Sequence, residues 1–144
     1  MTILYLIALF VLIIILISYI QDKRVKTRLQ EISLSRQIFT KDDFIKYFEL
    51  KGYHSYFSSI VYDEIKQHLI LKNFTFMPND NLHEICNMDD YGDNEFIDNI
   101  CSKLNLISPD QTICDKLNKR YTFFSPEYIL DLIQYNAKQI KTSG

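Results

Sequence analysis

The chain has 144 residues, of which 24% are charged, and its formal net charge is −2. This length suits one domain of ordinary size, because about 110 to 120 residues remain once an apolar N-terminal segment is set aside. Three Gly, three Pro and 14% aromatic residues exclude a disordered chain, which lacks the large apolar side chains that offset the entropy of folding.

The first predicted element is an apolar segment at the N-terminus. Residues Ile3 to Ile20 carry no charge, and at about 1.5 Å per residue a helix of this length crosses roughly 27 Å of hydrocarbon. Tyr5 and Tyr19 lie near its two ends, where aromatic rings favour the membrane interface. A cleaved signal peptide is the alternative, but a basic start and a small-residue cleavage site are missing. We therefore expect residues 1–21 to form a single transmembrane anchor.

A cluster of cations follows the anchor directly. Lys and Arg beside a span are retained in the cytoplasm, so the N-terminus is expected outside and the rest of the chain inside, at a bacterial inner membrane. The same cations attract anionic lipid headgroups. The cluster consists of Lys23, Arg24, Lys26 and Arg28.

The three cysteines agree with a reducing compartment. Their number is odd, and no C-x-x-C or Cys/His zinc spacing occurs. Reduced, partly buried thiols are expected at Cys86, Cys101 and Cys114.

The rest of the chain is predicted to be helical. A basic juxtamembrane helix or linker is expected over 22–39, and a cytosolic helical domain over 40–144. Thr40 opens the first helix of this domain through a capping box with Asp43, and Gly52 ends it. A second amphipathic helix is expected over about residues 56–71.

A loop and three further helices complete the predicted body. Residues 73–88 contain turn-forming residues around Pro78 and are expected to form a loop. A third helix is expected from Asp93. Ser108-Pro109 and Ser125-Pro126 each pair a capping residue with Pro and are expected to open the last two helices. The predicted fold class is therefore all-α, with one transmembrane helix followed by a small helical bundle.

Charge is distributed unevenly along the body. From Gln21 to Lys72 basic residues outnumber acidic ones by ten to seven, whereas from Asn73 to Asp115 nine acidic residues accompany one cation, Lys103. Nucleic acid binding needs clusters of Lys and Arg, so nucleic acid is not an expected partner. A protein with a basic surface is the expected partner of the acidic segment. The predicted partner-binding residues are Asp89, Asp90, Asp93, Glu95 and Asp98.

The acidic segment also carries a family resemblance. Residues 79–106 read NDNLHEICNMDDYGDNEFIDNICSKLNL, which resembles the acyl carrier protein pattern of an acidic loop, Gly-Asp-Ser-Leu at a helix start and an apolar stripe. It is more similar to a family of short, uncharacterised enterobacterial proteins related to acyl carriers, in which Tyr-Gly-Asp-Asp replaces Gly-Asp-Ser-Leu. The resemblance covers about residues 60–140 and implies an acyl-carrier-like bundle. The matching positions are Asp80, Leu82, Gly92, Asp93, Phe96, Ile97 and Ile100.

One departure from the carrier pattern has chemical consequences. A carrier presents a Ser hydroxyl for attachment of phosphopantetheine, and Asn94 occupies that position here. An amide cannot replace this nucleophile, and no Ser lies between Ile60 and Cys101 to restore it in a shifted alignment. The resemblance therefore implies the fold and an acidic docking helix without the prosthetic group, and no cofactor is expected.

Other chemistry has little support in the sequence. The five predicted acidic residues offer the oxygen ligands that divalent cations prefer, but the spacing of a calcium loop is absent, so a solvated helix start is expected in place of a metal site. No histidine stands at a recognised motif spacing from a Cys, Ser or carboxylate, and Ser58-Ser59 has no catalytic context. The histidines are His54, His68 and His83. No catalytic residue is predicted.

Several functional hypotheses remain open at this stage. The leading one is a non-enzymatic, membrane-tethered, carrier-like interaction module. The alternative is an inner-membrane immunity or antitoxin protein that binds and neutralises a toxin. A degenerate carrier that still accepts phosphopantetheine ranks third, and a membrane enzyme ranks last. Dimerisation through the span is not predicted, because Ala8 and Ser18 do not form a small-xxx-small motif, and the oligomeric state stays open.

Overall fold

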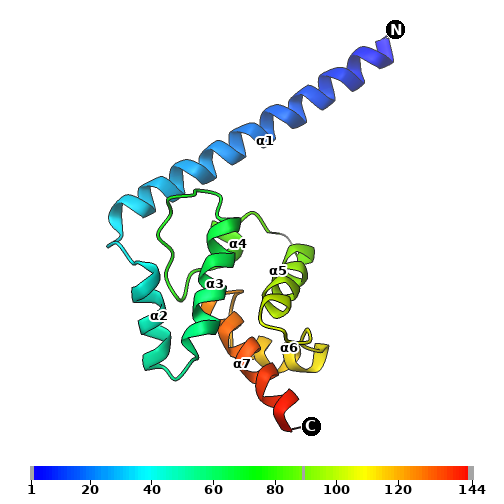
Figure 1. Cartoon of the computed structure of the whole chain (residues 1–144). Coiled ribbons are helices and arrows are strands. Elements are labelled where there is room, and N and C mark those ends of the chain that lie inside the picture. The colour runs from blue at the N-terminus through cyan, green and yellow to red at the C-terminus, as the bar shows by residue number, and fades with distance from the viewer. Residues whose placement is uncertain (1, 89, 143–144) are drawn as a thin grey trace. The chain divides into compact units, whose positions relative to one another are not determined.

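A computed structural model describes residues 2–88 and 90–142, with the backbone alone at residues 2, 4, 90, 91 and 139–142. The chain divides into two compact units, Met1–Arg36 and Gln37–Gly144. Seven helices and no strand occur among the described residues (Figure 1). The prediction of an all-helical chain is confirmed for this part of the sequence.

The first unit is a single helix, α1 (Thr2–Ser35). Its 34 residues correspond to a rise of about 51 Å. The apolar residues of the run to Ile20 whose side chains are described are exposed. By length and composition α1 is able to cross a membrane. Of the juxtamembrane helix or linker expected over 22–39, the part up to Ser35 is helical, because α1 has no break after the apolar run.

In the second unit, α2 (Lys41–Leu50) has both ends fixed by its own sequence. The predicted capping box is present: the Thr40 hydroxyl accepts from the Asp43 N–H at 3.2 Å, and the Asp43 carboxylate accepts from the Thr40 N–H at 2.9 Å. Gly52, at φ 87°, occupies the left-handed position after the helix, as predicted. Its N–H donates to Glu49 O, and the N–H of Tyr53 donates to Phe48 O, which completes a Schellman motif.

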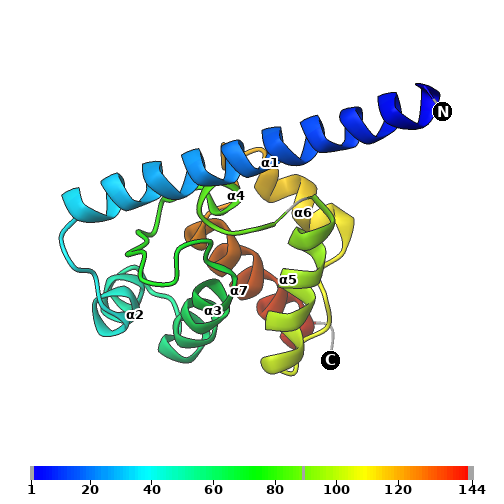
Figure 2. The same cartoon turned by 90° about the horizontal axis from the view of Figure 1, so that it is seen from above.

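The core of the second unit is built around α3 (Ser55–His68) and α7 (Pro126–Thr142). α3 contacts α2, α5 and α7, and α6 contacts α7; Figure 2 shows α7 passing between α3 and α5. Aromatic rings pack edge to face between α2 and its neighbours, with Phe44 at 5.3 Å from Tyr62 and 5.6 Å from Phe76. Edge-to-face pairs of this kind stabilise a core beyond the area that they bury.

The segment between α3 and α5 is mostly loop, as predicted, but it contains one helical turn, α4 (Leu82–Ile85). A single bridge pairs Leu69 with Cys86. The loop is tied to the start of α7, because the N–H of Leu82 donates to Phe124 O at 2.8 Å and the N–H of Glu127 donates to Pro78 O at 3.2 Å. Phe74 and Phe76 in this loop are buried, so it forms part of the core.

Two helix starts differ from the prediction. The third long helix, α5 (Asp90–Lys103), begins three residues before Asp93, since acidic residues in a first turn interact favourably with the helix dipole and offset the cost of Gly92. The next helix, α6 (Gln111–Asn118), is capped by Asp110 in place of Ser108. The Ser108 hydroxyl donates instead to Asp98.

The start of the last helix is confirmed. Ser125 caps α7 through its hydroxyl, which accepts from the Tyr128 N–H at 3.2 Å. Ile129, Leu132 and Ile133 on one side of α7 are buried, and the side chain of Ile140 lies outside the described residues.

Candidate functional site

α5 has an apolar inner face and a polar outer face. Phe96, Ile97, Ile100 and Cys101 are buried against the body. On the opposite side an exposed strip follows the spacing of a helix surface, and we call it the outer face of α5. It comprises Glu95, Asp98, Asn99 and Ser102.

Asp93 is separated from this outer face. Both of its carboxylate oxygens contact Nε2 of His83, at 2.8 and 2.7 Å, and the His83 ring stacks on Phe124 with centroids 5.5 Å apart. The pair joins α4 to the first turn of α5. Asp93 therefore has a structural contact that the sequence did not predict, because ten residues separate the partners and no local pattern links them.

The single cation of the acidic segment is bound to a buried acid. The Glu64 side chain is 3% exposed, and its carboxylate accepts a hydrogen bond from Lys103 Nζ. His68 Nδ1 lies 3.9 Å from the same carboxylate. A buried carboxylate needs such a partner to offset its loss of hydration. Lys103 is thus engaged with α3 and leaves the negative charge of the outer face uncompensated.

The other predicted acidic residues have different surroundings. Glu95 is exposed, and Asp98 is exposed while accepting from the Ser108 hydroxyl. Asp90 contributes the first backbone turn of α5, but its side chain is outside the described part, and Asp89 lies wholly outside the described residues. The structure therefore brings Glu95 and Asp98 together on one face and turns Asp93 toward His83.

Asn94, at the position of the carrier serine, is exposed. It lies in the second turn of α5, because the helix begins at Asp90.

The three thiols are free and poorly reactive. Burial raises the pKa of Cys86 to about 12 and that of Cys101 to about 11, and it also raises the pKa of the half-buried Cys114. A thiol reacts as its thiolate, so these side chains are not nucleophiles near neutral pH. Among residues 2–88 and 90–142, the His, Cys, Asp and Glu side chains form no group arranged to hold a metal ion.

A tyrosine and carboxylate cluster joins the turn after α2 and the segment before α7 to α7 itself. The Tyr53 hydroxyl donates to Asp131 at 2.5 Å, and the Tyr121 hydroxyl donates to the second oxygen of the same carboxylate. Nearby, Lys51 pairs with Glu127 at 2.7 Å. Burial, followed by the hydrogen bond to Asp131, raises the pKa of both tyrosines well above the usual range. The hydrogen bonds and the ion pair of the cluster link separate segments of the chain, so we assign it a structural role.

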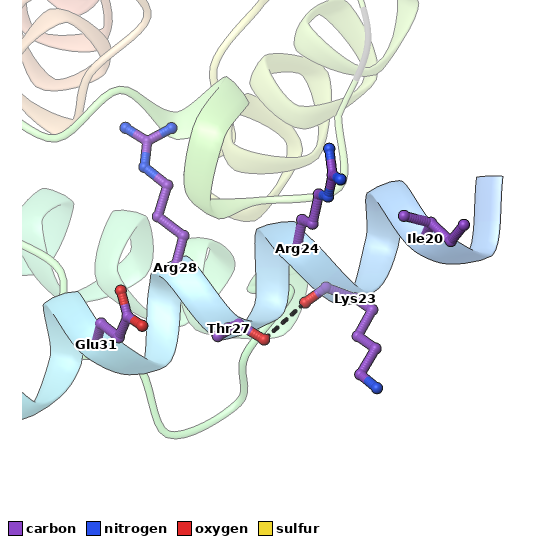
Figure 3. A pocket seen from close by; sticks show the side chains of 6 residues that line it. All are labelled: Ile20, Lys23, Arg24, Thr27, Arg28 and Glu31. Atoms are coloured by element: carbon purple, nitrogen blue, oxygen red, sulfur yellow. Dashed lines mark hydrogen bonds between the residues drawn. The ribbon is translucent and has the colours of Figure 1, made fainter. Parts of the chain in front are cut away.

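The basic residues after the apolar run are exposed on α1. Figure 3 shows Arg24 and Arg28 projecting from one side of the helix and Lys23 from the other. The Thr27 hydroxyl donates to Lys23 O at 3.0 Å. Six residues of α1 line the recess in this view, namely Ile20, Lys23, Arg24, Thr27, Arg28 and Glu31.

Comparisons with protein-family models, curated proteins and solved structures find no match to the chain.

Proposed function

We propose that this chain is a non-enzymatic adaptor, anchored by α1 in a bacterial inner membrane, with its helical body in the cytoplasm, where the outer face of α5 binds a protein with a basic surface. The observation that carries the proposal is the contact between Lys103 and Glu64. Because the one cation of the acidic segment serves a buried acid, Glu95 and Asp98 present unneutralised charge to solvent. Such charge raises association rates and selects a partner of opposite sign.

The membrane part of the proposal is supported by the length and composition of α1. Its exposed apolar side chains need a nonaqueous environment, and a helix satisfies every backbone N–H and C=O within lipid. The cations from Lys23 to Arg28 favour a cytoplasmic location for everything that follows them.

The carrier-like part of the proposal is supported by the order of elements. The long helix α3 is followed by a long loop. After the loop come α5 with its acidic start, the short helix α6 and the final helix α7. The same order is implied by the resemblance of residues 60–140 to acyl carriers. With Asn94 in place of the serine, the module binds a partner without carrying an acyl group.

Charge reversal tests the adaptor role. We expect Glu95→Lys with Asp98→Lys to abolish retention of the partner from solubilised membranes and cytoplasm, read by quantitative mass spectrometry of proteins retained on the tagged full chain. The matched control is Asp42→Lys with Glu49→Lys, which makes the same change in net charge on exposed positions of α2. Ser108→Ala separates the loss of the Asp98 hydrogen bond from the loss of charge.

The result that supports the proposal is a set of proteins retained by the wild type, the α2 control and Ser108→Ala, but lost from the α5 variant and at high salt. Equal retention by the α5 variant would reject the outer face as the binding surface.

The alignment of Asn94 with the carrier serine has a separate test. Wild-type chain incubated with a phosphopantetheinyl transferase and coenzyme A is expected to gain no mass. Asn94→Ser restores Gly-Asp-Ser at residues 92–94, and this variant is expected to gain one phosphopantetheine by intact mass spectrometry. No gain in the variant would count against the carrier-like alignment and would leave the adaptor hypothesis standing.

A further inference from the structure

We propose that the first turns of α1 beyond the apolar run bind anionic phospholipid headgroups through Lys23, Arg24 and Lys26, so that the anchor gathers anionic lipid around itself. The inference rests on the proposed membrane-spanning role of α1. It adds the class of lipid that the anchor contacts.

The depth of these cations follows from the unbroken helix. α1 continues past Ile20 without interruption, so Lys23, Arg24 and Lys26 lie about 4.5, 6 and 9 Å beyond the end of the apolar run. The headgroup layer of one leaflet is roughly 5–8 Å thick. In a helix each Cα–Cβ bond tilts toward the N-terminus, which is the direction of the bilayer here. The three side chains therefore lie at, or lean back into, the layer that holds the lipid phosphates.

The arrangement around the helix favours several lipids over one soluble ion. Lys23 and Arg24 project from opposite sides of α1 (Figure 3), and Lys26 stands at helical i, i+3 spacing from Lys23. Cations that point in different directions do not enclose a single phosphate. Lipids packed around a helix meet all of its sides at once, so the geometry fits headgroups in a bilayer.

The three cations are available for this role. Each is exposed, and no ion pair or hydrogen bond of their side chains occurs among the residues that the structure describes. The sequence from residue 21 to residue 30 contains one carboxylate, Asp22, against four cations. Arg28 lies about 12 Å beyond Ile20, the farthest of the four cations from the headgroup layer, and is not part of the proposed contact.

Spin-label spectroscopy of the full chain in nanodiscs tests the inference. The discs contain phosphatidylcholine with a minority of phosphatidylglycerol, and a spin-labelled copy of either lipid reports the fraction immobilised by the protein. Each cation beside an anionic surface contributes roughly a fivefold change in affinity. We therefore expect phosphatidylglycerol to be preferred by about fivefold or more, and the preference to fall toward one at high salt.

A matched pair of triple variants locates the effect. Lys23→Gln, Arg24→Gln and Lys26→Gln together are expected to remove the preference. Lys46→Gln, Lys119→Gln and Arg120→Gln remove the same charge from exposed positions of the body and are expected to preserve it. Resistance of the first variant to alkaline extraction from membranes checks that it is still inserted, and the salt dependence of the wild type tests the inference without any substitution.

The outcomes distinguish this inference from the proposed function. If neither lipid is immobilised and alkaline extraction releases the chain, α1 is not a membrane anchor and the proposed function fails. If the chain is inserted but shows no preference between the two lipids, or if the first triple variant keeps the preference, lipid binding is rejected while the anchor stands. If inorganic phosphate at matched ionic strength removes the preference, the cations form a soluble-anion site and the inference is overturned.

Discussion

α2 and α5 differ in what fixes their ends. The start of α2 is set by Thr40 and Asp43, with Phe39 packed on Phe44 at 6.5 Å in a hydrophobic staple, and its end is set by Gly52. All of these residues lie within or beside the helix, and the distant partners of its two ends, Asp63 for Lys41 and Glu127 for Lys51, add ion pairs to caps that are already formed locally. α5 also ends in a local motif, with Asn105 at φ 54°, but its start is joined to His83 and its last turn to Glu64.

In this comparison α2 is part of the scaffold of the body, and α5 provides an exposed surface. α2 and α3 hold together through the packed rings of Phe44 and Tyr62 and through an exposed ion pair of Lys41 with Asp63 at 2.6 Å. α5 adds to its apolar inner face a polar contact with the buried Glu64.

Two polar contacts of α5, Asp93 with His83 and Lys103 with Glu64, use residues of this helix that are not part of the outer face. A third, from Ser108 to Asp98, reaches the outer face and leaves Asp98 exposed. The outer face of α5 is thereby left as exposed charge on a firmly attached helix.

Removing a ring from the scaffold should have the largest effect. Phe44 is fully buried, and its ring packs on Phe48 at 4.8 Å as well as on Tyr62 and Phe76. Phe44→Ala is expected to lower the free energy of unfolding by about 3–5 kcal/mol, measured by denaturant titration of the full chain in nanodiscs. Leu50→Ala on the same helix is the control, because Leu50 is 82% exposed. Equal effects of the two substitutions would show that the aromatic core does not hold α2.

Removing the cation that joins α5 to α3 should have the next largest effect. Lys103→Met keeps the apolar stem and leaves the Glu64 carboxylate buried without its partner, and this is expected to lower the free energy of unfolding by roughly 2–3 kcal/mol. Adding Glu64→Gln should recover at least half of that loss. Lys46→Met, at an exposed position, should change little. Full additivity of the Lys103 and Glu64 substitutions would mean that the two side chains are not coupled.

A pH titration tests whether the scaffold also depends on a polar tie. The raised pKa values of Tyr53 and Tyr121 mean that folding favours their neutral forms. Their contribution to stability is therefore complete below pH about 10 and is lost as the pH rises through the folded pKa values. Asp131→Asn should lower both pKa values and reduce the free energy of unfolding near neutral pH by about 1–2 kcal/mol. The titration is followed by phenolate absorbance, and unchanged midpoints in the variant would exclude Asp131 as the cause.

Substitutions on the outer face of α5 should change the free energy of unfolding least. Glu95→Lys with Asp98→Lys is expected to shift the free energy of unfolding by no more than about 0.5–1 kcal/mol, because Glu95 has no described contact and Asp98 has one exposed hydrogen bond, from Ser108. The same denaturant titration measures this. A loss as large as that of Lys103→Met would give the outer face a structural role and weaken its assignment to binding.

Local chemistry explains which features were predictable. The capping box at Thr40, the left-handed glycine at Gly52 and the Ser125 cap are each encoded within a few residues, and all three are present. The predicted start of α6 was wrong, because the Ser108 hydroxyl donates to Asp98 on the preceding helix and does not cap α6. A short-range sequence pattern does not show whether a capping residue will bond to a distant part of the chain instead.

The candidate site was predictable to a similar degree. The acidic character of α5 follows from composition, but whether a given carboxylate faces solvent depends on distant residues. Asp93 was grouped with Glu95, yet it faces His83. One signal was available: a lone Lys103 within an acidic segment suggests a cation kept for a buried acid, which the structure identifies as Glu64.

Site-specific photo-crosslinking in living cells tests the central claim most directly. A crosslinking amino acid replaces Glu95 on the outer face of α5 or, in a parallel strain, Glu49 on α2, which is also exposed. The account predicts that a protein with a basic surface is captured from position 95 and not from position 49, and that Asp98→Lys suppresses the capture. The same products from both positions, or none from position 95, would contradict it.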